Sequence, residues 1–290
     1  MEWYIFAGLC ALFAGMSAIV EKKTLKKQHA MEFSTVLAIF NFIVVLPLLI
    51  KADFHSITTN AYILIFGVSI LGSVAFLLVA KSLRHMEISQ ASPLLNFGPV
   101  FVAILAFIFL GETITAVQLA GIFLILIGSY VLEIEHGFQG VFDPLKKMAS
   151  SKHILYIFAA LILYGFSSLG DKIILGTIAP ITYIIVVQFF IAVNFIVMIS
   201  VFHDGITGIK RGIRNAGKWI LIVAILTTSY RLFQAQAVSM VFVSLVTPIK
   251  RTSTLFATIV GGEIFHDEGL TKKAISCIIM LLGAYLVIVG

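Results

Sequence analysis

The chain has 290 residues, of which 60% are hydrophobic and only 12% charged, and its mean hydropathy is +1.08. Soluble domains carry about a quarter charged residues, so this composition excludes an ordinary soluble protein and predicts a polytopic membrane protein. The two cysteines, Cys10 and Cys277, lie near opposite ends of the chain and have neither a metal-ligand spacing nor a disulfide framework. We therefore expect no cofactor and no metal. The net charge of +6 comes mostly from basic loops, so we expect membrane lipid rather than nucleic acid as its anionic partner.

Apolar blocks of near 20 residues recur along the chain, and this is the length that carries a helix across a ~30 Å hydrocarbon core. The first block has no basic n-region, so we interpret it as a span and not as a secretory signal. The predicted fold is all-α, with ten transmembrane helices over about 3–20, 33–50, 61–80, 89–110, 116–132, 154–173, 181–202, 219–239, 243–260 and 273–289.

The basic residues alternate between loops. Loops that follow odd-numbered spans hold Lys22, Lys23, Lys26, Lys27, Lys81, Arg84, Lys146, Lys147, Lys152, Lys210, Arg211, Arg214, Lys218, Lys272 and Lys273, whereas loops after even-numbered spans hold Lys51 and Lys172. Loops rich in Lys and Arg stay on the cytoplasmic side. This pattern predicts that both termini lie outside.

Two halves of the chain resemble each other in the same order of motifs. GMSAIVEK at 15–22 matches GFSSLGDK at 165–172, NFIVV at 41–45 matches NFIVM at 194–198, and LIGSYVL at 126–132 matches LLGAYLV at 281–287. The pair Gly111-Glu112 recurs as Gly262-Glu263. These matches predict two five-span repeats, 1–136 and 153–290, joined by a linker at 137–152. An odd number of spans inverts the second copy, and inverted repeats of transporters place the substrate site between the halves near the midplane.

The stretch SPLLNFGPVFVAILAFIFLGETITAVQLAGIFLILIGSYVL at 92–132 resembles the EamA repeat of the drug/metabolite transporter superfamily. The resemblance rests on a Pro-bearing start of the fourth span, a Gly-Glu at its end, and a Gln-x-x-Gly leading into a fifth span with a late Gly. The second copy, 244–290, keeps Gly-Glu and the late Gly but has Lys-Arg where the first copy has prolines and Asn96; some family members share this Lys-Arg-Thr-Ser form. The resemblance covers the whole chain.

This resemblance implies a secondary transporter of small metabolites, often an exporter, with a central cavity and alternating access. From it we also expect a prokaryotic cell (inner) membrane protein, and because ten spans suffice to enclose a site, we expect a functional monomer. The chain departs from the family in two respects. The first span reads ALFAGMSA where small four-span relatives carry a proton-binding Glu, and the basic loops oppose the family's usual cytoplasmic termini.

Lys250 and Arg251 lie in the apolar ninth block, where a cation costs about 2.5–3.5 kcal/mol at the bilayer centre. Thr247, Lys250 and Thr254 share one helical face by i+3 and i+4 spacing. This stripe predicts a cavity wall that attracts an anionic group, with Lys250 pointing inward. The alternative is that the cations pair with Glu21, Asp171 or a helix carboxyl end, or extend to the interface.

Arg231, with Gln234 at i+3, is a third intramembrane cation that we expect in the same cavity or tied to a neighbouring span. The three cations predict an anionic or zwitterionic substrate, such as an amino acid. On the fourth span, Asn96 and Ser92 form an equivalent polar stripe, for which cavity lining and interhelical bonding stay open. The predicted substrate-binding residues are Lys250, Arg251, Arg231, Gln234, Thr247, Thr254, Asn96 and Ser92.

Equivalent acid-base pairs, Glu21-Lys22 and Asp171-Lys172, end spans one and six. They either gate or couple transport through ion pairs across the halves or are ordinary interface charges. Asn41 and Asn194, at matching repeat positions, are typical of helix–helix hydrogen bonding. Glu112 and Glu263 end their spans, and Thr115-x-x-Gln118 predicts a capping box at the start of the fifth span, so we expect a structural role for the Gly-Glu pair.

Two other classes remain as alternatives. A carrier of lipid-linked sugar phosphates would suit the same cations. An intramembrane enzyme is disfavoured, because the stretch GMSA at 15–18 lacks the last Gly of a Gly-x-Ser-Gly motif and no predicted span holds a His as a base.

Overall fold

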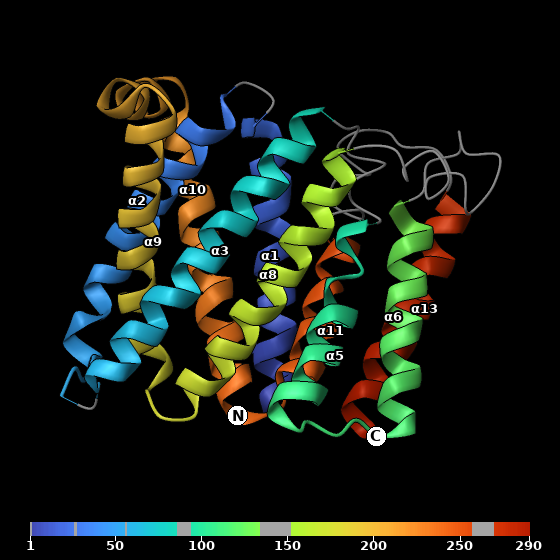
Figure 1. Ribbon diagram of the computed structural model, residues 1–290. Coiled ribbons are helices and arrows are strands. Elements are labelled where there is room, and N and C mark those ends of the chain that lie inside the picture. Colours follow the sequence, from blue (N-terminus) through green and yellow to red (C-terminus); the bar gives the residue numbers. More distant parts are fainter. Residues whose placement is uncertain (1, 26–27, 56, 86–93, 134–151, 257–269) are drawn as a thin grey trace.

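The computed structural model describes residues 2–25, 28–55, 57–85, 94–133, 152–256 and 270–290, and it forms a bundle of roughly aligned helices (Figure 1). The elements of the first half are α1 (Trp3–Leu25), α2 (Ala30–Val45) with the 3-10 turn η1 (Leu46–Lys51), α3 (Thr59–His85), α5 (Gly98–Leu110) and α6 (Ala116–Glu133). Those of the second half are α8 (Lys152–Leu175), α9 (Pro180–Phe202), α10 (Gly205–Met240), α11 (Val243–Arg251) and α13 (Leu270–Val289).

Within the described ranges, six helices are long and apolar enough to cross a membrane: α1, α2 with η1, α3, α8, α9 and α10. Gly98–Leu110, Ala116–Val131 and Ile275–Val289 are shorter apolar helices. Large apolar side chains such as Phe107, Phe109 and Leu281 are more than half exposed at the outer surface, as expected where lipid replaces water. The all-helical membrane class is confirmed.

The structure corrects two of the predicted continuous spans. In the predicted fourth span, 89–110, the chain leaves the helix at Asn96 and Phe97 and α5 begins at Gly98, with Pro99 in its first turn. In the predicted ninth span, 243–260, α11 ends at Arg251 and Thr252 forms a turn. Proline lacks the backbone donor of a continuing helix, which explains the start of α5. At the second break, hydroxyls satisfy freed carbonyls: Thr252 Oγ1 donates to Ile249 O at 2.7 Å.

The contacts between helices recur when the two halves are exchanged. In chain order, α1, α2, α3, α5 and α6 correspond to α8, α9, α10, α11 and α13. The pair α1–α10 has its counterpart in α8–α3, α2–α10 in α9–α3, and α11–α1 in α5–α8, while α2–α9, α5–α11 and α6–α13 pair equivalent helices. α1 and α8 run in opposite directions through the bundle (Figure 1).

Helices α6 and α13 pack closely at one side of the bundle (Figure 1). A Cβ atom on Gly121 would lie 2.6 Å from Gly283 O, and one on Gly283 would lie 2.6 Å from Gly121 O. Only glycine allows the two backbones to approach this closely, a common arrangement where helices meet in lipid.

Both termini lie at the same end of the bundle (Figure 1). The opposite end holds the first part of α10, which a non-helical backbone at Ala216 separates from the rest of the helix. This part carries Lys210, Arg211 and Arg214. The predicted eighth span, 219–239, lies beyond the kink.

Candidate functional site: a charged cavity between the halves

A cavity of about 370 Å³ lies inside the bundle. Its walls come from α1, α2, α3 and α5 of the first half and from α8, α9, α10 and α11 of the second. The described parts of α6 and α13 do not line it. Its size lies within the range of about 300–1,000 Å³ that is usual for small-molecule sites.

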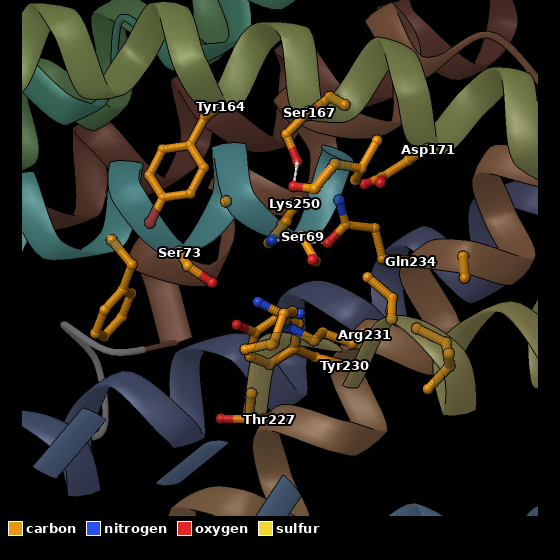
Figure 2. A pocket seen from close by; sticks show the side chains of 18 of the residues that line it. Ser69, Ser73, Tyr164, Ser167, Asp171, Thr227, Tyr230, Arg231, Gln234 and Lys250 are labelled. Carbon is orange, nitrogen blue, oxygen red and sulfur yellow. Dashed lines mark hydrogen bonds between the residues drawn. The ribbon is translucent and has the colours of Figure 1, made fainter. Parts of the chain in front are cut away.

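Lys250 reaches the cavity from the last turn of α11. Its Nζ donates to Gln234 Oε1 at 2.7 Å and lies 4.8 Å from the centre of the Tyr230 ring (Figure 2). Arg231 and Gln234 are one turn apart on α10, so the same face of this helix presents a cation and the amide that orients Lys250. The hydrogen bond and the cation–π contact hold the ammonium in the cavity without neutralising it.

Arg251 also lines the cavity, at its border with the first half. An ideal Cβ on Gly98 would lie 3.1 Å from Arg251 Nη2. The guanidinium therefore packs against the start of α5, where glycine leaves room for it.

Two carboxylates, Glu21 on α1 and Asp171 on α8, line the same cavity at equivalent positions of the two repeats. Asp171 accepts a short hydrogen bond from the Tyr183 hydroxyl of α9. In the described part of the chain, no carboxylate lies within the 4.0 Å of an ion pair from Lys250 or Arg231. Internal ion pairs with Glu21 or Asp171, one of the two sequence alternatives, therefore do not explain these two cations.

The structure places most of the predicted site residues together. The cavity is lined by Glu21, Asp171, Arg231, Gln234, Thr247, Lys250 and Arg251. Asn96 is buried at the break before α5 and Thr254 bonds Arg251 O at 3.0 Å, and neither lines the cavity. Ser92 and the side chain of Lys22 lie outside the described part. Whether these residues bind substrate stays a prediction.

Lys172 lies outside the cavity lining, and its contacts are structural. Its Nζ donates to Val238 O and Val241 O, both at 2.8 Å, at the carboxyl end of α10. A cation at this position stabilises the unpaired carbonyls and the dipole of the helix end. Asp171 and Lys172 thus both bond within the second half, and their gating role with Glu21 and Lys22 remains a prediction.

Sequence reasoning missed the hydroxyls that face the cations. Ser69 and Ser73 of α3 and Tyr164 and Ser167 of α8 line the cavity (Figure 2). Their spacing of three or four residues could have indicated a common helical face, but serine and tyrosine are ordinary in such spans.

The expectation for the matched asparagines holds for one of them. Asn194 Nδ2 donates to Ser69 Oγ at 2.9 Å, which joins α9 to α3. Asn41 lines the cavity instead, and its buried Oδ1 has no hydrogen bond in the structure, so the predicted helix–helix role is wrong for Asn41.

Glu112 joins the first half to the helix that carries the cations. Its carboxylate accepts from Val243 N at 3.0 Å, from Ser244 N at 3.1 Å and from the Ser244 hydroxyl. It thus caps the first turn of α11, where the dipole favours an anion. The expected structural role of this Gly-Glu is confirmed, as is the capping box, with Thr115 N to Gln118 Oε1 at 3.0 Å and Gln118 N to Thr115 Oγ1 at 3.1 Å. Glu263 lies outside the described residues.

A separate polar cluster lies at the junction of α9 and α10 with α2. Ligand atoms of Glu32, His203 and Asp204 lie within 4.8 Å of one another, a spacing that could hold a metal ion. Arg211 already binds both carboxylates, Glu32 Oε1 and Asp204 Oδ2, at 2.8 Å each. The cluster therefore forms an ion-pair network that ties the two halves together away from the cavity.

An all-helical bundle with many apolar spans around a charged central cavity defines a polytopic membrane protein. The chain matches the EamA-like transporter family over residues 1–134 and 151–289 and belongs to that family, within the drug/metabolite transporter superfamily.

Two individual proteins are similar to this chain. An uncharacterized protein of Methanocaldococcus jannaschii is 31% identical over 139 residues, which make up 47% of this chain and 100% of that protein. A protein of known crystal structure has the same fold, with a TM-score of 0.73, 13% identity, and coverage of 97% of this chain and 94% of its own.

Proposed function

We propose that this membrane transporter carries small anionic or zwitterionic metabolites by alternating access at the charged cavity. The observation that carries the proposal is the position of Lys250 and Arg231. Both line a cavity of small-molecule size, and neither has a carboxylate partner within ion-pair distance in the described residues. A cation in a water-poor cavity without a carboxylate in direct contact is costly, so a ligand that supplies negative charge at Lys250 and Arg231 is favoured there.

Alternating access by two inverted five-span repeats is the mechanism we propose. The helix pairs that recur on exchange of the halves, and the opposite directions of α1 and α8, support it (Figure 1). The relative that matches about half of this chain over its own full length supports a duplicated unit. One chain supplies all the walls described above, which supports a transporter that functions as a monomer.

Counterflow in proteoliposomes tests this function. Vesicles that contain the purified protein are loaded with unlabelled amino acids, organic anions or phosphorylated sugars. Uptake of the same labelled compound in exchange is then followed. An anionic or zwitterionic substrate should exchange, Lys250→Ala should lower the exchange at least tenfold, and Lys218→Ala, an exposed lysine of α10 outside the cavity, should leave it unchanged. Transport of cationic dyes alone would contradict the proposal. Ion gradients imposed in either direction across the same vesicles test the direction of net substrate transport. The family leads us to expect export.

A further inference from the structure

The first half contributes uncharged polar groups to the cavity that have no hydrogen-bond partner among the described residues. Ser73 on α3 is 1% exposed and Asn41 on α2 is 5% exposed. Both line the cavity, and neither Ser73 Oγ nor Asn41 Oδ1 has a hydrogen bond in the structure. Buried polar side chains are normally hydrogen-bonded, so these two atoms indicate that the occupant of the cavity supplies donors and acceptors.

These groups face the cationic wall. Figure 2 shows the Ser73 hydroxyl directed into the space that Tyr230 and Arg231 border from α10, and Tyr164 of α8 reaches the same space. The cations belong to α10 and α11 of the second half, whereas Asn41 and Ser73 belong to the first. The cations of the cavity thus come from the second half, and the unbonded uncharged groups come from the first half, which also contributes the carboxyl group of Glu21.

The charge of the lining limits the charge of the ligand. Three cations, Arg231, Lys250 and Arg251, and two carboxylates, Glu21 and Asp171, line the cavity. The cations therefore outnumber the carboxyl groups by one, which favours a ligand with a net negative charge.

From these observations we infer that the substrate is a polyhydroxylated monocarboxylate, that is, a sugar acid such as an aldonate or uronate. Its carboxylate lies against Arg231 and Lys250, and its hydroxyls bond Ser73 and Asn41. A simple amino acid is a zwitterion without net charge, so it does not balance the excess of cations over carboxylates in the wall. A phosphate ester or a dicarboxylate brings more negative charge than the excess of one cation balances, and an aliphatic acid leaves Ser73 Oγ and Asn41 Oδ1 unpaired. This inference rests on the proposed function and specifies its substrate.

A substrate panel tests the inference on the full-length chain in proteoliposomes. Labelled gluconate is exchanged against gluconate, galacturonate, propionate, glucose, alanine and glucose 6-phosphate. We expect both sugar acids to exchange, with propionate, which lacks the hydroxyls, and glucose, which lacks the charge, at least tenfold weaker. A site built to bond substrate hydroxyls discriminates strongly against analogues without them.

The panel also separates the two proposals. Exchange of alanine or of glucose 6-phosphate in preference to the sugar acids would overturn this inference and leave the proposed function standing. If no anion or zwitterion exchanges, both the substrate inference and the proposed function are wrong.

A matched pair of variants tests the binding wall directly. Ser73→Ala should raise the KM for gluconate about three- to tenfold, the size expected for one lost hydrogen bond, while exchange of propionate stays the same. Ser276→Ala on α13 is the control, because Ser276 is also buried with an unbonded hydroxyl but does not line the cavity. If both variants change gluconate exchange equally, or if neither does, the assignment of Ser73 to substrate binding is wrong. Stabilisation of the unmodified protein against heat by gluconate, and not by propionate, is an independent readout.

Discussion

The Arg251 guanidinium lies against Gly98, where the absence of a side chain leaves room for it. The sequence indicated that a cation lies in the membrane at residue 251, because the apolar blocks on both sides are long. It did not indicate the partner, since Gly98 is 153 residues away and carries no chemical signal. Such cross-half contacts depend on helix packing and cannot be read from local periodicity.

Replacing Gly98 with alanine should therefore alter transport more than stability. The new Cβ would lie 3.1 Å from Arg251 Nη2, and the guanidinium is the end of a flexible side chain that can shift by a few tenths of an ångström. We expect Gly98→Ala to change the free energy of unfolding by less than about 1 kcal/mol and to raise the KM of transport at least threefold. Thermal unfolding in detergent and exchange kinetics measure the two effects. Gly67→Ala, where a Cβ meets nothing within 4 Å, is the control. A large loss of stability with normal KM would contradict this view of Arg251.

At the scale of elements, the sequence predicted the existence of the helices better than their continuity. The apolar blocks at 154–173 and 181–202 correspond closely to α8 and α9. The predicted spans at 89–110 and 243–260 are broken, because proline removes a backbone donor and a threonine hydroxyl bonds a carbonyl at the helix end. Mean hydropathy registers neither effect. The break after Arg251 places the cations at the end of a short helix, whose start Glu112 fixes.

Loss of the Glu112 cap should impair the cation-bearing helix α11. Glu112→Ala leaves Val243 N and Ser244 N without their buried acceptor, so we expect a loss of stability of about 1–3 kcal/mol. Glu112→Gln keeps one acceptor oxygen but loses the charge at the helix start. Its stability should therefore lie between those of Glu112→Ala and the unmodified protein. Thermal unfolding in detergent ranks the three proteins, and Glu2→Ala, near the start of the chain, controls for the loss of an acid. Equal stability of all three would show that the cap contributes nothing.

The close pair α6–α13 gives a second prediction at this scale. A Cβ on Gly121 meets Gly283 O at 2.6 Å and Val287 N at 2.9 Å, and these backbone atoms can move only if the helices separate. Gly121→Ala should lower the stability by about 1–3 kcal/mol through overpacking. Gly8→Ala, which meets nothing within 4 Å on α1, should not lower it. Because α6 does not line the cavity in the described residues, the KM of the folded fraction should stay unchanged, and a changed KM would contradict this separation of roles.

At the scale of the whole molecule, the repeat could be predicted from the sequence. Which residues of each half line the cavity could not. Matched motifs identified equivalent positions such as Glu21 and Asp171, and the structure brings both to one cavity. The same equivalence misassigned Asn41, because its partner position, Asn194, meets Ser69 while Asn41 faces open space. Equivalent residues of a duplicated chain diverge in function where the two halves line different walls of one cavity.

The orientation of the bundle in the membrane is a property of the whole charge distribution. Both termini lie at one end (Figure 1), and the basic first part of α10 lies at the other. Since basic segments stay cytoplasmic, we expect an alkaline phosphatase fused after Gly290 to be active in Escherichia coli, and a fluorescent protein fused there to be dark. The reporter fused instead to the end of a fragment that stops at Lys218 should give the opposite result, which controls for export of the reporter itself. A fluorescent carboxyl-terminal fusion would contradict this orientation. The fifteen basic loop residues would then not determine the topology, and the basic first part of α10 would lie on the outer side of the membrane.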